Sequence, residues 1–128
     1  MSAASEIETT DRLEPQFDGA GLISCIVVDA ATGDVLMLAH MNEDALDRTI
    51  KTGEAWFWSR SRRELWRKGE SSGNTLAVSE MLIDCDQDAV LLKVAIRGQG
   101  VACHTGRRSC FYRRVALKGA ADAPLTFV

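Results

Sequence analysis

Short apolar runs alternate with polar turns along most of the chain, and this pattern predicts a domain rich in β-strands. Strand-like runs occur at 22–28, 35–39, 54–59, 75–83, 89–96 and 110–117. The first two runs flank the turn residues Gly33 and Asp34, so we expect them to pair as a hairpin. An acidic turn at 84–88 separates the fourth run from the fifth. The segment 59–74 is polar, basic and contains Gly and Ser, which predicts a loop or irregular structure.

One short helix is predicted after Asn42. Asn42 suits the N-cap position, and Glu43 and Asp44 fill the first turn, where the helix dipole favours acidic side chains. Apolar and small residues then recur on one face, and Gly53 is placed to end the helix. Many short strands with so little helix indicate an α+β fold: a small, mostly antiparallel, β-rich domain with one or two short helices.

The length of 128 residues suits one domain with a modest core. We expect a flexible N-terminal arm over 1–18, a domain over 19–118 and a C-terminal tail over 119–128. A hydrophobic content of 46% argues against disorder. The N-terminus lacks a basic region followed by an apolar one, and no apolar run is long enough to cross a bilayer. The predicted location is therefore cytoplasmic, with no membrane partner.

Charge is distributed unevenly. Residues 1–47 contain ten acidic residues and one basic residue, whereas 48–128 contain eight acidic and fourteen basic residues. The net charge is -3, and a protein that binds nucleic acid in bulk is usually basic overall, so no nucleic-acid partner is expected. We interpret the basic half as a local anion site centred on 59–74, where guanidinium groups and Gly/Ser turns suit phosphate oxygens. A solvated basic surface is the alternative.

Three aspartates occupy alternate positions in the sequence DCDQD. In an extended chain Asp84, Asp86 and Asp88 would project to one face, because side chains alternate with period two. Carboxylates and water are the ligands that Mg²⁺ prefers, so the cluster is a candidate magnesium site. A solvated acidic turn is the alternative, and the spacing is not that of an EF-hand.

Three of the four cysteines are candidate metal ligands. Cys25 lies in an apolar run, and we interpret it as a small buried hydrophobic residue. Disulfides are rare in a reducing compartment, and thiolates from Cys85, Cys103 and Cys110 would suit Zn²⁺ with one position left for water. Three unrelated free cysteines are the alternative. His104 follows Cys103 and is either a general base beside the metal or a surface histidine.

Together these motifs resemble one enzyme family. The segments LMLAHMNEDAL, WSRSRRELWRKGESSGN, DCDQDAVLL and ACHTGRRSCFY are similar to phosphoribosyl-AMP cyclohydrolase of histidine biosynthesis, over most of the chain. The resemblance implies a homodimeric metalloenzyme with Zn²⁺ and Mg²⁺, in which the cysteine ligands of zinc are shared between subunits. The implied zinc ligands are Cys85 of one subunit with Cys103 and Cys110 of the other. The implied magnesium ligands are Asp84, Asp86 and Asp88, and the implied catalytic residue is His104.

The resemblance also implies a phosphorylated nucleotide substrate, 1-(5-phosphoribosyl)-AMP. Hydroxide would add to C6 of the purine, the N1–C6 bond would break, and the ring would open to the formimino carboxamide ribotide. The residues expected to bind this substrate are Ser59, Arg60, Ser61, Arg62, Trp66, Lys68, Gly69, Ser72, Gly73 and Asn74. The chain is expected to be the single-activity form. It departs from the family pattern at His40, where an aromatic residue is common, and in a slightly longer stretch between Cys85 and Cys103.

Two other classes of function compete with this interpretation. A zinc nucleobase deaminase requires the strings H-x-E and P-C-x-x-C, and neither occurs here. A small zinc-stabilised module that binds nucleotides or RNA without catalysis is the remaining alternative, with tryptophan stacking and arginine contacts. Its metal would be structural, so chelation would unfold it, whereas loss of a catalytic zinc would leave a folded, inactive protein.

Overall fold

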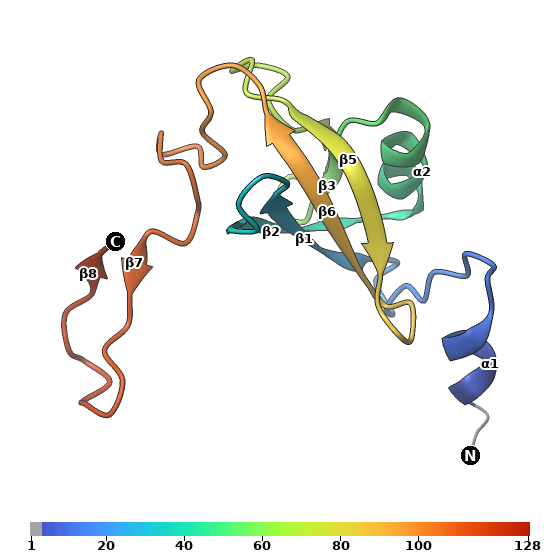
Figure 1. Cartoon of the computed structure of the whole chain (residues 1–128), viewed down its shortest axis with the longest axis horizontal. Helices are drawn as coiled ribbons and strands as arrows, with labels where there is room; N and C mark the ends of the chain where they lie inside the picture. Colours follow the sequence, from blue (N-terminus) through green and yellow to red (C-terminus); the bar gives the residue numbers. More distant parts are fainter. Residues whose placement is uncertain (1–3) are drawn as a thin grey trace.

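A four-stranded sheet with the strand order β2-β1-β6-β5 forms the centre of the computed structural model, which describes residues 4–128 (Figure 1). Its strands are β1 (Ile23–Asp29), β2 (Val35–Met41), β5 (Leu76–Ile83) and β6 (Ala89–Ile96). The pairs β1–β2 and β5–β6 are antiparallel, and β1 and β6 run parallel where the two hairpins join. The predicted α+β class, the mostly antiparallel pairing and the first hairpin are confirmed.

The helix α2 (Glu43–Thr52) packs against β2 and against a smaller sheet made of β3 (Trp56–Ser59) and β4 (Glu64–Arg67). Its predicted caps are confirmed. The Asn42 side chain accepts a hydrogen bond from the main-chain N–H of Ala45 at 2.8 Å. Gly53 ends the helix with φ of 72°, a conformation that a residue without Cβ adopts at little cost.

The prediction of irregular structure over 59–74 is wrong in part, because β4 lies within it. β4 pairs antiparallel with β3, and Phe57 lies opposite Trp66 with ring centroids 5.3 Å apart. Leu65 and Trp66 also pack against the hydrophobic core. Aromatic cross-strand pairs stabilise a sheet, and here they outweigh the polar neighbours on which the loop prediction rested.

The predicted strand at 110–117 is also wrong for most of its length. Only Arg113–Arg114 (β7) form a strand there, paired with β8 (Thr126–Phe127). Figure 1 shows this C-terminal hairpin projecting away from the body of the molecule. Its apolar side chains are exposed, namely Phe111, Val115, Leu117, Leu125, Phe127 and Val128. Extended backbone without a neighbouring strand gains little from an apolar sequence, because no core covers it.

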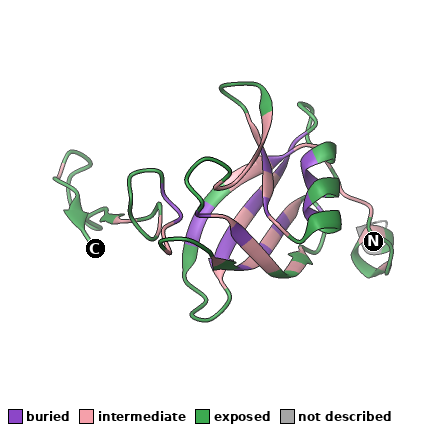
Figure 2. Ribbon diagram, turned by 90° about the horizontal axis from the view of Figure 1, so that it is seen from above, coloured by how far each residue is buried: buried purple, intermediate pink, exposed green. Residues whose placement is uncertain are grey.

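The core lies between one face of the central sheet and the layer formed by α2, β3 and β4 (Figure 2). Alternate side chains of β1 and β6 enter it, including Cys25, Val27 and Leu92, which are fully buried. Burial raises the pKa of the Cys25 thiol to about 12, so the interpretation of Cys25 as a buried hydrophobic residue is confirmed.

The other face of the sheet carries an apolar row that stays accessible. One residue from each strand lies in register across it: Leu38, Ile26, Leu91 and Leu82. Leu38 is 52% exposed and Leu82 is 43% exposed. We refer to these four side chains as the open-face row.

The N-terminal segment contains the short helix α1 (Ala4–Thr9) and then runs to the edge of the body. Phe17 packs against the core. The main-chain N–H of Gln16 donates to the carbonyl of Gln87 at 2.7 Å. The division into arm, domain and tail stays a prediction. Within residues 4–128, every helix is too short or too polar to cross a bilayer.

Candidate metal and substrate sites

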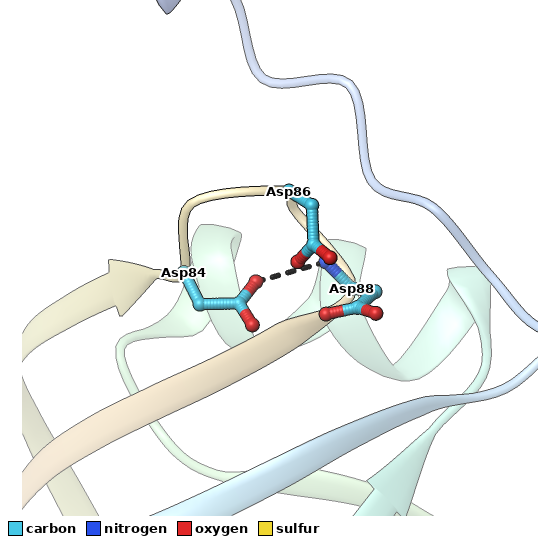
Figure 3. Close-up of side chains that lie close together, drawn as sticks. All are labelled: Asp84, Asp86 and Asp88. Carbon is cyan, nitrogen blue, oxygen red and sulfur yellow. Dashed lines mark hydrogen bonds between the residues drawn. The ribbon is translucent and has the colours of Figure 1, made fainter. Parts of the chain in front are cut away.

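The three predicted magnesium ligands lie together in the turn between β5 and β6 (Figure 3). One carboxylate oxygen each from Asp84, Asp86 and Asp88 lies within 4.8 Å of the other two. The segment is not extended, as sequence reasoning supposed. The main-chain N–H of Gln87 donates to the Asp84 carbonyl at 3.1 Å, and Gln87 has φ of 59°. A tight turn, rather than strand alternation, brings the carboxylates together.

The carboxylates of this acidic turn have unequal proton affinities. Hydrogen bonds to Asp86 and Asp84 raise the pKa of Asp88 to about 6. Burial works to raise the pKa of Asp84, but main-chain N–H groups of Ala89 and Asp88, at 3.1 Å and 2.9 Å from its Oδ1, bring it below its usual range. Asp88 therefore gives up its proton less readily than Asp84, and a hard cation bound among the three carboxylates would compete with that proton.

Two predicted zinc ligands form a thiol pair in the loop that follows β6. The side chains of Cys103 and Cys110 hydrogen-bond to each other, and Cys103 is 7% exposed. Burial works to raise the pKa of Cys103, but the Thr105 hydroxyl, 3.0 Å from its Sγ, and the charge of Lys68 lower it overall. Burial and the neighbouring Cys103 raise the pKa of Cys110 to about 11. Cys110 therefore holds its proton more tightly than Cys103, and the charge of Lys68 acts on both thiols.

The loop between these cysteines is anchored to the first hairpin by Arg108. Its guanidinium group donates to Asp29 at 2.9 Å and to Asp34 at 3.1 Å, on either side of the β1–β2 turn. The main-chain N–H of Cys110 donates to the carbonyl of Leu36 in β2 at 2.7 Å. Sequence reasoning missed Arg108, because only the folded chain brings it beside that turn.

A pocket of about 330 Å³ opens beside the thiol pair. It is lined by Lys68, Ser72, Asn74, Gln99, Val101, Ala102, Cys103, His104 and Gly106. The structure therefore unites a predicted zinc ligand, the predicted catalytic histidine and three of the predicted substrate-binding residues. Asn74 is buried, and its Oδ1 accepts a hydrogen bond from the main-chain N–H of Gln99 at 2.7 Å. This bond ties the two lining loops together.

Two predicted substrate-binding glycines shape the same loop. Gly69 and Gly73 both have φ of 82°. A Cβ on Gly69 would lie 2.3 Å from the main chain of Asn74, so no larger residue fits there without a shift of the backbone. Their role in the structure is to fold the loop that carries Ser72 and Asn74 to the pocket.

The other predicted substrate-binding residues lie around the β3–β4 hairpin. Ser59, Arg60, Ser61 and Arg62 lie at its turn, outside the lining of the pocket among the described residues. Arg60 instead lines a depression of about 390 Å³. Trp66 lies nearer the pocket, with the ammonium of Lys68 5.8 Å from its ring centroid. The structure thus divides the predicted anion site into two parts.

His40 lies on β2, half-buried near that depression. Burial, followed by the charge of Arg60, lowers the pKa of its imidazole, and Asp18 opposes this effect.

The third predicted zinc ligand is far from the thiol pair within one chain. Cys85 is exposed in the acidic turn, at the start of β6, whereas Cys103 follows the end of β6. β6 contains 8 residues, and at about 3.4 Å per residue a strand of this length spans roughly 24 Å. Among residues 4–128, the only group of three or more candidate ligands that converge is the aspartate cluster. Figure 1 shows the two ends of β6 at opposite ends of the sheet.

Comparison with known proteins gives a consistent result. Residues 37–112 match the family model described as phosphoribosyl-AMP cyclohydrolase. A phosphoribosyl-AMP cyclohydrolase of Nitrobacter winogradskyi is 60% identical over 98% of this chain and 86% of its own length. That of Sphingopyxis alaskensis is 62% identical over 94% of this chain and 91% of its own. That of Bradyrhizobium diazoefficiens is 59% identical over 100% of this chain and 90% of its own.

Proposed function

The chain belongs to the phosphoribosyl-AMP cyclohydrolase family, enzymes of histidine biosynthesis, and from this membership we propose how it acts. It hydrolyses the N1–C6 bond of 1-(5-phosphoribosyl)-AMP in the cytoplasm, as a homodimer that requires Zn²⁺ and Mg²⁺. The observation that carries the proposal is the pocket in which Cys103 and His104 lie with Lys68, Ser72 and Asn74. The thiol of Cys103, the imidazole of His104 and the anion-binding groups there surround one space of about 330 Å³, large enough for part of a nucleotide.

The thiol pair fits a zinc ion in its chemistry. Cys103 and Cys110 are close enough to share a hydrogen bond, and the pKa of Cys103 is lowered from its ordinary value despite burial. Thiolates are the ligands that Zn²⁺ favours, and Cys85 of a second subunit would complete a set of three. Zinc with one open coordination position lowers the pKa of water towards neutrality, which supplies a nucleophile at neutral pH.

The chain's own groups do the remaining work in the pocket. The imidazole of His104 accepts the proton of the attacking water and returns a proton to the leaving N1 as the ring opens. Lys68 presents an ammonium group to substrate anions, and burial, which lowers its pKa, reduces the competition from water. The hydrogen bond from Gln99 to Asn74 holds the two lining loops at a fixed separation.

The acidic turn fits magnesium, because three carboxylates with unequal proton affinities already converge there. Asp84, Asp86 and Asp88 would each provide one oxygen, and a substrate phosphate together with water would provide the remaining ligands. A single active site that uses both metals cannot be built from one chain whose two sites lie at opposite ends of β6. This separation supports a dimer in which the acidic turn of one subunit faces the pocket of the other.

Two apolar surfaces support the same assembly. Leu38 and Leu82 of the open-face row are exposed, and so are the six apolar side chains of the C-terminal hairpin, among which Phe127 stacks on Tyr112 with ring centroids 6.1 Å apart. Contiguous exposed apolar patches of this kind are typical of protein interfaces. Burying them against a second copy would also bring the C-terminal half, which carries Cys110, onto that copy.

The proposal is tested with purified protein, zinc and magnesium, by following the absorbance change of ring opening on addition of 1-(5-phosphoribosyl)-AMP. We expect turnover in the wild type and its loss in Cys103→Ala. Cys25→Ala is the matched control, because Cys25 is a buried core residue and its loss should leave turnover intact. Turnover of Cys103→Ala at the wild-type rate, with zinc present, would contradict the proposal.

Chelation separates this proposal from the non-catalytic module. We expect metal removal to abolish turnover while circular dichroism still reports folded protein. Unfolding on chelation, combined with salt-dependent RNA binding and no turnover, would favour the module. The family membership does not favour that alternative.

A further inference from the structure

We propose that Gln87, clamped by the N-terminal segment 7–16, positions the three carboxylates of the acidic turn and so sets their affinity for a divalent cation. This inference rests on the magnesium site of the proposed function and deepens it. Gln87 is the one buried residue of the turn: it is 4% exposed, whereas Asp84, Asp86 and Asp88 are exposed. A buried amide between exposed carboxylates must be satisfied by the protein rather than by water.

All of the partners of the Gln87 side chain are main-chain groups of the N-terminal segment. Its Oε1 accepts from the N–H of Glu14 at 2.7 Å. Its Nε2 donates to the carbonyls of Arg12 at 3.2 Å and Ile7 at 3.4 Å. The Gln87 carbonyl accepts from the N–H of Gln16 at 2.7 Å. Gln87 thus forms hydrogen bonds with main-chain groups of four residues in the segment. Figure 3 shows this segment passing beside the three aspartates.

The hydrogen bonds of Gln87 matter because they hold the turn in an unfavourable conformation. Gln87 has φ of 59°, in the left-handed region that residues other than Gly and Asn rarely adopt. Its two neighbours in sequence, Asp86 and Asp88, carry like charges that repel each other. Both effects favour opening of the turn, and the hydrogen bonds from the N-terminal segment oppose them. A cation that binds an already closed turn need not supply the free energy of closing it.

The test measures Mg²⁺ affinity directly, by calorimetry on the full-length, zinc-saturated protein. Gln87→Met keeps the length of the side chain but removes its amide. We expect its dissociation constant for Mg²⁺ to rise by about fivefold or more, the usual scale of coupling between sites. The KM for substrate should rise at limiting Mg²⁺ and recover at saturating Mg²⁺, with kcat retained. Amide exchange at Glu14 should become faster, because its acceptor Oε1 is removed, whereas Gln16 keeps the main-chain carbonyl of residue 87 as its acceptor.

Three further variants make the outcome specific. Arg12→Ala removes the exposed ion pair with Glu14, 3.0 Å long, but keeps the main-chain carbonyl that Gln87 uses, so it should bind Mg²⁺ as the wild type does. Gln87→Gly relieves the strain of the left-handed backbone conformation but does not restore the side-chain amide, so its affinity for Mg²⁺ should stay below that of the wild type. Asp86→Asn removes a proposed ligand, so it gives the Mg²⁺ affinity of a protein with an incomplete site.

Each result has a distinct meaning. Wild-type Mg²⁺ affinity in Gln87→Met, or in Gln87→Gly, overturns the inference and leaves the magnesium site standing. A lower melting temperature in Gln87→Met with unchanged affinity shows a purely structural role and also overturns it. If the wild type and Asp86→Asn bind Mg²⁺ equally, the magnesium site itself is refuted, and the inference with it.

Discussion

If zinc is shared between two subunits, inactive chains should complement each other in a defined ratio. The perturbation is a pair of single variants, Cys85→Ser and Cys103→Ser. β6, which has 8 residues and at about 3.4 Å per residue is roughly 24 Å long, lies between the segments that carry these cysteines. Among residues 4–128, no group of three candidate ligands that includes them converges. Neither cysteine can therefore serve the same ion as the other within one chain, and each variant alone should be inactive.

A heterodimer of the two variants has one intact site. Cys85 of the second variant meets Cys103 and Cys110 of the first, while the other site lacks both altered thiols. The purified heterodimer should therefore have about half the wild-type activity, and a random mixture about a quarter, because a two-fold dimer has two equivalent sites. Co-expression with two different affinity tags isolates the heterodimer, and turnover is measured by the absorbance change of ring opening.

The matched control places both substitutions in one chain and pairs it with a wild-type chain. Each site then lacks one thiol, so this heterodimer should be inactive although it contains the same substitutions. A site built within one chain predicts the opposite pattern, with about half activity in the control and none in the complementing pair. That opposite pattern would refute the shared site and the argument from the length of β6.

Three further predictions follow from local contacts. Arg108→Ala should weaken zinc binding, measured by competition with a chromogenic chelator, because it frees the cysteine loop from Asp29 and Asp34. An unchanged zinc affinity would contradict this role. Gly69→Ala should cost at least about 2 kcal/mol in urea unfolding, through its left-handed φ and its approach to the Asn74 main chain, whereas Gly19→Ala, with open space around it, should cost little. Because the pKa of Asp88 is raised to about 6, the metal-free folded state binds more protons than the unfolded state between about pH 4 and 6, so the free energy of unfolding should fall as the pH rises through that window. Mg²⁺ or the substitution Asp88→Asn should remove this fall, measured as the urea midpoint. Persistence of the fall in Asp88→Asn would show that another group causes it.

Features of the fold with a local cause were predictable from the sequence. Asn42 and Gly53 bound α2 because a capping side chain and a left-handed glycine act on their immediate neighbours. The hairpin around Gly33 follows in the same way from turn chemistry. The parallel pairing of β1 with β6 joins segments far apart in the sequence, and no local signal specifies it. β4 follows its partner β3 closely in the sequence, but its polar neighbours obscured it, and the contact of Trp66 with Phe57 shows itself only in the folded chain.

The candidate site was predictable as a set of residue types but not as an arrangement. The spacing of the aspartates identified the acidic turn, although the mechanism of convergence is a left-handed Gln87 rather than an extended strand. Gln87 and Arg108 were missed, because their partners lie 70 or more positions away in sequence. The periodicity of hydrophobic and polar residues carries no information about contacts between residues so far apart in the sequence. The substrate-binding stretch was predicted as one unit, and the fold divides it between the pocket and the β3–β4 turn.

The acidic and basic parts of the sequence lie at opposite ends of β6 in the folded chain. The acidic N-terminal segment lies beside the acidic turn, at one end of β6, through the hydrogen bonds of Gln87. Basic residues gather at the other end, where Lys68 lines the pocket and Arg67 and Arg97 bind Glu54. In the proposed dimer, the acidic end of each subunit meets the basic end of its partner, so this contact occurs twice, once at each shared site. Complementary charge of this kind selects the antiparallel alignment of two chains over the parallel one, because parallel chains would place like charges together. The charge asymmetry would then serve the assembly of the site as well as the binding of substrate phosphates.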